Sequence, residues 1–429
     1  MPLRLDARDP GFPDAFTGLV NARRESDPGV ARDVAAIIAA VRADGDAALA
    51  TYTQQFDHHD LEATGWSVGK AERRTALEAL TPELRKALEL AADRIRVYHE
   101  RQKPTDSDNV DQAGVRLGAR WRAVDAAGLY VPGGRAAYPS SLLMNAIPAK
   151  VAGVERLTMV TPTPNGEINP LVLAAAEIAG IDEIWRVGGA QAVAALAYGT
   201  RRIRAVDVIT GPGNAWVAEA KRQLYGVVGI DMVAGPSEIV VVADAANEPD
   251  WIAADLLSQA EHDPTSQSIL FTDDDAFADA VAVAVERQLG ELSTEATART
   301  SWSVNGAIIV VGALIDAAPL VDRLAPEHLE LAVEDPQPLF DAVRHAGSIF
   351  IGRHTPEAIG DYVGGPNHVL PTGRRARFSS GLSVLDFMKR TSFLACDPRS
   401  IRHVGPAAVA LAEAEGLPAH ARSVAERLK

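Results

Sequence analysis

From about residue 129 onward, short runs of apolar, mostly β-branched residues alternate with helical stretches. Gly, Pro or Asp bounds these runs, which lie at 157–160, 184–187, 205–209, 239–242, 269–271, 307–311 and 348–351. Between them, apolar residues recur at helical spacing, for example at 171–178 and 276–289. Strands that alternate with helices in this way predict an α/β fold with a parallel sheet covered by helices on both faces.

The first hundred residues carry a helical pattern instead. Thr81 and Pro82 are typical of a helix start, with a capping hydroxyl followed by proline at the first helical position. An apolar stripe at helical spacing then continues to about Gln102. It consists of Leu84, Leu88, Ala91, Ile95 and Tyr98. After this helix, the alternation around residues 115–119 predicts a strand.

The last fifty residues contain few strand signals. Helical patterns at 407–415 and 421–428 flank the breaker Gly416-Leu-Pro418. This tail is too small to form a hydrophobic core of its own, so we expect it to pack against another body.

Composition narrows the class of protein. A length of 429 residues suggests about two to three domains, and 47% hydrophobic with 23% charged residues excludes a disordered or fibrous chain. A net charge of −15 and the lack of a basic stripe argue against nucleic acid and an anionic membrane surface as partners. The longest uncharged run, 300–315, is too short to span a bilayer, and the N-terminus lacks the apolar segment of a signal peptide. We therefore expect a cytoplasmic protein.

Glycine-rich loops interrupt the α/β pattern at five places: 130–134, 188–191, 211–214, 235–238 and 364–368. In parallel sheets, ligands bind beyond the carboxyl ends of the strands, and glycine there allows the backbone to approach a ligand closely. Ordinary turn chemistry is the alternative for each loop. None is a dinucleotide fingerprint, because Trp216 stands where the third glycine would be. These loops alone do not establish a nucleotide cofactor.

Polar residues with catalytic or metal-binding side chains occur in four regions. Gln259 and His262 share one face of a predicted helix over 250–263, and Glu327 and His328 are adjacent. The other two regions contain Asp361 with His368, and Glu415 with His420. A helix cap for the first pair and a solvent-exposed turn for the second remain alternatives. Ligands so far apart in the chain suit an accessible site at a domain or subunit boundary, with zinc, manganese or cobalt as the metal.

Eight motifs, in this order, resemble the histidinol dehydrogenase family over essentially the whole chain, with no departure at a functional position. They are Tyr130-VPGG, Val187-GGAQAVAALAYGT, Gly211-PGNAWV, Asp231-MVAGPSE, Asp255-LLSQAEHDP, Ala325-PEHLEL, Gly360-DYVGGPNHVLPT and Glu415-GLPAH. The resemblance implies oxidation of L-histidinol to L-histidine, the final steps of histidine biosynthesis, through L-histidinaldehyde and with two NAD+.

The resemblance also implies the site residues. The implied ligands of one Zn2+ per subunit are Gln259, His262, Asp361 and His420, and the implied catalytic pair is Glu327 and His328. The implied substrate contacts are Ser237, His368, Glu415, His328 and the four zinc ligands. The implied NAD+ contacts are Tyr130, Gln191 and Asn214.

The implied fold has two incomplete Rossmann-like parallel-sheet domains in an intertwined homodimer with shared active sites. Its parts are an N-terminal arm (1–25), a first α/β domain (26–129 plus 239–381), a second one on the NAD+ side (130–238) and a tail (382–429) that crosses to the partner subunit. The alternatives in other classes are a zinc hydrolase, for which a compact ligand motif such as HExxH is absent, and a non-catalytic histidinol- or histidine-binding protein.

The single cysteine, Cys396, excludes an intrachain disulfide and a Cys-rich zinc site. Aldehyde oxidation can proceed through a cysteine thiohemiacetal. Cys396 lies in an apolar stretch with no cationic neighbour to activate it, so we expect a packed small hydrophobe there.

Overall fold

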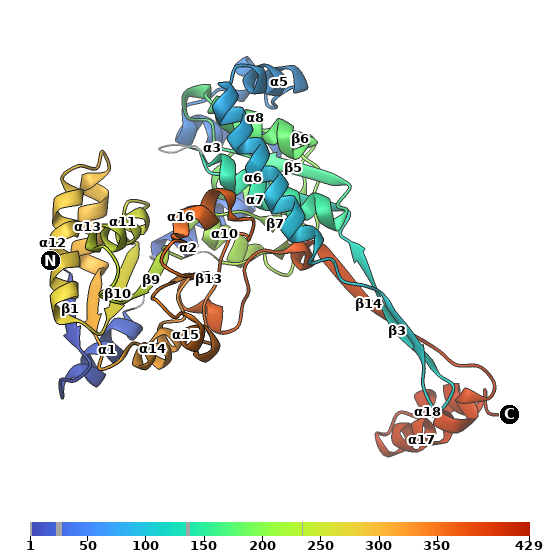
Figure 1. Ribbon diagram of the computed structural model, residues 1–429. Helices are drawn as coiled ribbons and strands as arrows, with labels where there is room; N and C mark the ends of the chain where they lie inside the picture. The colour runs from blue at the N-terminus through green and yellow to red at the C-terminus, as the bar shows by residue number, and fades with distance from the viewer. Residues whose placement is uncertain (1, 23–27, 134–137, 234) are drawn as a thin grey trace.

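The computed structural model describes residues 2–22, 28–133, 138–233 and 235–429. Residues 23–25 of the expected N-terminal arm, Gly134 of the 130–134 loop and Ala234 of the motif that begins at Asp231 lie outside the described residues. Two parallel sheets and one antiparallel ribbon organise the rest (Figure 1).

The first sheet has six parallel strands. In spatial order they are β1 (Leu3–Asp6), β11 (Ala307–Val310), β10 (Gln267–Thr272), β9 (Glu238–Ala243), β12 (His328–Ala332) and β13 (Ser348–Ile351). Helices α11 (Pro249–Ala260), α12 (Asp275–Leu289) and α13 (Glu295–Asn305) bury one face. Helices α1 (Phe12–Asn21), α14 (Ala317–Leu324) and α15 (Gln337–Ala342) bury the other. The expected N-terminal arm thus supplies the edge strand β1 and a covering helix.

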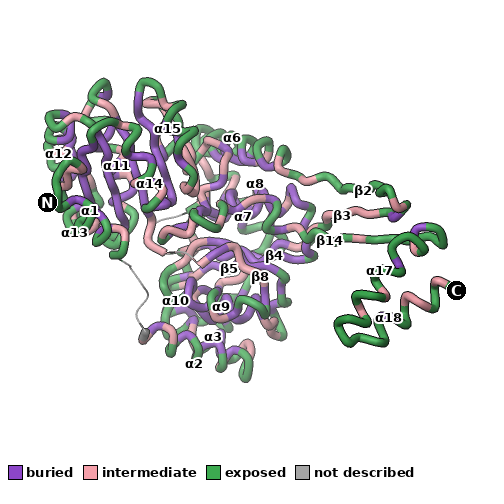
Figure 2. The backbone as a smooth tube through the Cα atoms, turned by 90° about the horizontal axis from the view of Figure 1, so that it is seen from below, coloured by how far each residue is buried: buried purple, intermediate pink, exposed green. Residues whose placement is uncertain are grey.

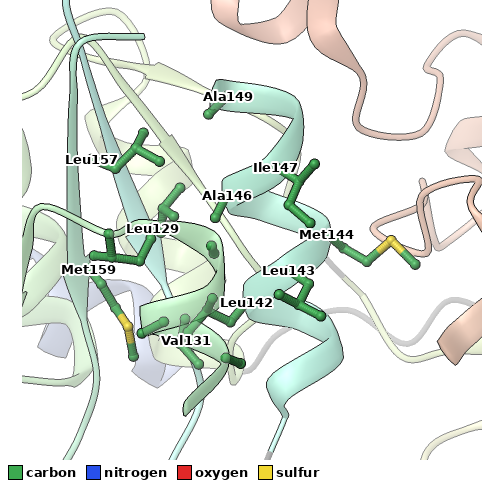
Figure 3. Packing of buried hydrophobic residues seen from close by; sticks show 14 of the residues in the cluster. Leu129, Val131, Leu142, Leu143, Met144, Ala146, Ile147, Ala149, Leu157 and Met159 are labelled. Atoms are coloured by element: carbon green, nitrogen blue, oxygen red, sulfur yellow. The ribbon is translucent and has the colours of Figure 1, made fainter. Parts of the chain in front are cut away.

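The second sheet has five parallel strands: β6 (Glu183–Trp185), β5 (Arg156–Val160), β4 (Ala126–Tyr130), β7 (Val208–Thr210) and β8 (Gly229–Ile230). One face packs against α5 (Lys70–Glu78), α6 (Pro82–Glu100), α7 (Pro139–Ala152) and α8 (Pro170–Ala179). The opposite face packs against α2 (Pro28–Asp44), α3 (Asp46–Asp57), α4 (Leu61–Thr64), α9 (Gly189–Tyr198) and α10 (Ala215–Leu224). Figure 3 shows Leu142 and Ala146 of α7 on the side of the helix that faces Leu129 and Val131, at the end of β4.

A long antiparallel ribbon leaves this second body and carries the tail. It consists of β2 (Ser107–Val110), β3 (Arg116–Ala123) and β14 (Met388–Ala395). At its far end lie α17 (Ser400–Ala414) and α18 (Pro418–Ala425), well away from both sheets (Figure 1). Most of these two helices is exposed, unlike the purple interiors of the two bodies (Figure 2).

Short helical turns connect the remaining segments: η1 (Pro164–Gly166), η2 (Leu314–Asp316), α16 (Glu357–Ile359), η3 (Gly360–Gly364), η4 (Arg375–Arg377) and η5 (Val384–Phe387). None of the helices in the described ranges is long and apolar enough to cross a membrane.

Three sequence expectations differ from this architecture. Helices of the 28–100 segment pack on the five-stranded sheet, whereas the expected division grouped 26–129 with residues 239–381. The tail region contains an eight-residue strand, β14, where few strand signals were found. Cys396, expected to be a packed hydrophobe, is exposed just beyond β14, because no other part of the described chain covers the ribbon there.

Candidate active site

The candidate catalytic residues cluster at the amino edge of the six-stranded sheet. His328 is the first residue of β12, and Ser237 directly precedes the neighbouring strand β9. Helix α11 runs back along the sheet and ends at Ala260, which brings Gln259 to the same edge. This location corrects the expectation that the site lies beyond the carboxyl ends of these strands, and it excludes a solvent-exposed turn at Glu327-His328, because both residues are buried.

The surroundings of the His328 ring assign its two nitrogens different roles. Nδ1 lies 3.1 Å from the carbonyl oxygen of Glu238 and 3.1 Å from Oε1 of Gln259. Two acceptors at this distance require Nδ1 to carry the hydrogen. Nε2 then has a free lone pair; it has no hydrogen-bond partner among the described residues and lies 3.9 Å from Oδ1 of Asp361. Burial lowers the pKa of His328 to about 4, so the ring is neutral and able to accept a proton at Nε2.

Glu327 precedes His328 and is also buried, at 6% exposure. Its Oε2 accepts a hydrogen bond of 2.9 Å from the backbone N–H of Glu238 and lies 3.7 Å from Nδ1 of His328. The carboxylate is therefore held against the strand beside the imidazole. A carboxylate and an imidazole fixed side by side form a candidate acid–base pair.

Three of the four expected metal ligands gather around His328. Gln259 is fully buried, and its Nε2 lies 2.9 Å from Nδ1 of His262, which is exposed in the turn after α11. Asp361 lies in the turn η3, with Oδ1 3.8 Å from Nδ1 of His368. His368 also reaches the other body, because its Nε2 is 3.3 Å from the hydroxyl of Ser141 in α7. The site therefore lies where the two bodies meet.

Glu357 is a residue that the sequence analysis missed. Its Oε1 lies 3.1 Å from Nδ1 of His328, and its side chain is buried. Burial, and then the nearby charges of Asp361 and Glu327, raise the pKa of Glu357 well above its usual range. Ligand-type atoms of His328, Glu357 and Asp361 lie within 4.8 Å of one another. The signal that could have identified Glu357 is its position four residues before Asp361, one helical turn away on the same face.

The expected NAD+ contacts lie at the carboxyl edge of the five-stranded sheet. Tyr130 ends β4, and its hydroxyl accepts a 3.0 Å hydrogen bond from the N–H of Gly189. Gln191 is buried in the first turn of α9, and its Oε1 has no partner among the described residues. Asn214 caps α10, accepting from the N–H groups of Trp216 and Val217 at 3.1 and 3.2 Å. The three side chains thus come from neighbouring loops at one sheet edge.

Glu415 and His420 do not lie near the residues around His328. Glu415 follows α17 and His420 belongs to α18, and both residues are exposed on the tail at the far end of the ribbon (Figure 1). Within one chain, the expected fourth metal ligand and one expected substrate contact are therefore separate from the rest.

Comparisons with known proteins agree on one family. Residues 20–428 match the family model described as histidinol dehydrogenase. A relative from Zymomonas mobilis named histidinol dehydrogenase is 65% identical over 428 residues, which cover 100% of both chains. A second one, from Rhodospirillum rubrum, is 64% identical over 429 residues, which cover 100% of this chain and 99% of the relative. The crystal structure of histidinol dehydrogenase from Elizabethkingia anophelis is 35% identical, with a TM-score of 0.94 and coverage of 100% of this chain and 98% of that chain.

Proposed function

Because the chain belongs to the histidinol dehydrogenase family, we propose that it oxidises L-histidinol to L-histidine through L-histidinaldehyde, with two NAD+ as hydride acceptors. The observation that carries this proposal is the buried, neutral His328. Its free Nε2 faces Asp361, beside Gln259 and next to Glu327. The site therefore combines a proton acceptor with groups able to hold a polar substrate.

We propose Gln259, His262 and Asp361 as ligands of one Zn2+, with His420 as the fourth. The donor set fits: two imidazoles and two side-chain oxygens suit zinc, and the first three residues surround His328. When bound, zinc holds and orients the imidazole and amine of histidinol. His368, Ser237 and Glu415 complete the proposed substrate contacts.

His328 removes protons in both oxidations. Nε2 takes the hydroxyl proton of histidinol while the carbon-bound hydride passes to the first NAD+. The aldehyde then adds one water, which Glu327 activates by accepting its proton. His328 acts again as the resulting diol gives its hydride to the second NAD+. Keeping both steps in one buried site retains the reactive aldehyde.

We propose that the complete site needs two chains. The tail presents large apolar side chains to solvent, namely Leu394, Val404, Leu411 and Leu417. Exposed apolar residues clustered on a protruding segment indicate a contact with another surface. A tail that docks on the partner subunit would cover them and deliver Glu415 and His420 to the partner's site. This arrangement supports an intertwined homodimer with shared active sites.

The stoichiometry of NADH tests the function. We expect two NADH for each histidine formed from histidinol, with no free aldehyde captured by an added trapping amine. One NADH with accumulating aldehyde would contradict the single-site, two-step mechanism. A protein that binds histidinol without forming NADH would support the binding-protein alternative, and amide hydrolysis without NADH would support the hydrolase.

A further inference from the structure

A buried ion pair lies beneath the loops of the proposed NAD+ site. Lys221 projects from α10, and Asp231 follows the edge strand β8. Their side chains are only 2% and 1% exposed, and the Lys221 Nζ contacts the Asp231 carboxylate. Neither residue belongs to the catalytic or metal groups described above.

Both members of the pair bind the same backbone residue, Gly211. Oδ2 of Asp231 accepts a 2.8 Å hydrogen bond from the Gly211 N–H, and Nζ of Lys221 donates a 2.9 Å hydrogen bond to the Gly211 carbonyl. The other carboxylate oxygen of Asp231 accepts from the N–H of Met232 at 2.6 Å. Together, Lys221 and Asp231 therefore form hydrogen bonds with both the N–H and the C=O of Gly211.

Gly211 cannot easily be replaced by another residue. Its φ of +116° is in the region that favours glycine, and a Cβ there would lie 2.1 Å from the carbonyl oxygen of Tyr130. Gly211 begins the loop that ends at Asn214, the cap of the helix that carries Lys221. The loop is thus fixed at its start by the ion pair and at its end by the helix cap.

The same contacts connect all three expected NAD+ residues. Tyr130 touches Gly211 through its backbone and binds the N–H of Gly189 through its hydroxyl. Gly189 opens the helix turn that carries Gln191. A displacement of Gly211 would therefore be transmitted to Tyr130, Gln191 and Asn214 together.

A contribution to the stability of the folded protein does not by itself explain why a charged pair is buried next to Gly211. Burying two charges usually costs as much as their attraction returns, and an apolar pair of similar volume often serves stability as well or better. An apolar pair could not bind both the N–H and the C=O of Gly211. We propose that Lys221 and Asp231 are positioning residues that fix the 211–214 loop for NAD+ binding. This inference rests on the proposed use of NAD+.

The test uses the double variant Lys221→Met with Asp231→Asn in the full-length enzyme. Both charges are removed together, so no unpaired charge stays buried, and the amide oxygen introduced at position 231 can still accept from the Gly211 N–H. What is lost is the donor to the Gly211 carbonyl, together with the second acceptor oxygen at position 231, which binds the N–H of Met232 in the wild type. Because the charge-assisted hydrogen bond that fixes the Gly211 carbonyl is removed, we expect the KM and Kd for NAD+ to rise about tenfold or more. The KM for histidinol should stay within about twofold.

A matched control is the pair Arg73 and Glu177, which joins α5 to α8 in the same body, with Arg73 4% exposed. The variant Arg73→Met with Glu177→Gln should lower the melting temperature without changing NAD+ binding. NADH binding is measured directly by fluorescence titration as well as by turnover. A folded double variant with unchanged affinity for NAD+ and NADH would overturn the positioning role. Failure of the wild-type protein to bind NADH would instead overturn the proposed function.

Discussion

Burial keeps His328, the proposed proton acceptor of the site, in its neutral form. An exposed histidine is partly protonated near pH 6.5, whereas His328 is held neutral inside the protein, with its pKa lowered to about 4. The oxygens around Nδ1 then determine that Nε2 is the nitrogen able to accept a proton. Glu327 adds a carboxylate whose own position is fixed by the N–H of Glu238. In the proposed mechanism, two adjacent residues thus act as two different proton acceptors.

The roles of Glu327 and His328 can be separated by half-reaction. We expect Glu327→Gln to impair mainly the oxidation of supplied histidinaldehyde, because only that half needs an activated water. His328→Asn should slow both halves by about 100-fold or more, since general base catalysis contributes about 10²–10⁴-fold. Single-turnover measurements with histidinol and with histidinaldehyde distinguish the two. Wild-type rates of aldehyde oxidation by Glu327→Gln would refute the role given to Glu327.

Strand β12 and helix α11 carry two further acids next to the site, the buried Glu330 and the half-buried Asp255. Glu330 lies two residues after His328 on the same face of β12, and Asp255 lies one turn before Gln259 on α11. Burial, and then the neighbouring Asp255 charge, raise the pKa of Glu330 to about 9. Burial likewise raises the pKa of Asp255 to about 6. These elements therefore place carboxyl groups where the charged form is unfavourable.

This placement predicts how stability depends on pH. The folded protein holds a proton on Glu330 up to about pH 9, whereas the unfolded chain releases it near 4.5, so stability falls as pH rises between these values. We expect Glu330→Gln to reduce this fall and to raise the unfolding free energy at pH 9 by about 1 kcal/mol or more. Thermal melts at pH 6 and pH 9 measure the difference. Glu334→Gln, at a position whose side chain is 85% exposed, is the control, and an unchanged pH slope in Glu330→Gln would contradict the assignment.

The sequence predicted these elements unevenly, for physical reasons. Helix α6, expected over 81–102, spans Pro82–Glu100, because its cap and stripe are local features. Strand β12 escaped detection because His328 and Glu330 interrupt its apolar pattern while being buried. Within the described ranges, strand β14 pairs only with β3 and is largely exposed, so it has no apolar face to detect.

The site itself was predictable in its residue types but not in its arrangement. Gln259, His262, Asp361 and His328 were each identified, yet only the packing shows that they converge at the amino edge of a sheet. Glu357 and the Lys221–Asp231 pair were missed because their significance comes from burial, which no local pattern reports.

The residues of the proposed site are distributed over the two bodies and the tail. The six-stranded body contains the proposed catalytic pair, and the five-stranded body contains the expected NAD+ contacts. His368 and Ser141 connect them. The tail carries Glu415 and His420 away from both bodies along the ribbon (Figure 1). A second chain is the simplest source of the missing groups, since a symmetric dimer exchanges the same element in both directions.

Complementation between two inactive variants tests whether two chains share each active site. His262→Asn and His420→Asn should each be folded and inactive alone. Refolded together in equal amounts, they should form heterodimers in about half of the molecules. In each heterodimer one site has both lesions and the other has neither, so NADH formation should recover to about a quarter of the wild-type rate. If the tail serves its own chain, every site retains one lesion and the mixture stays inactive, which would contradict the shared active site.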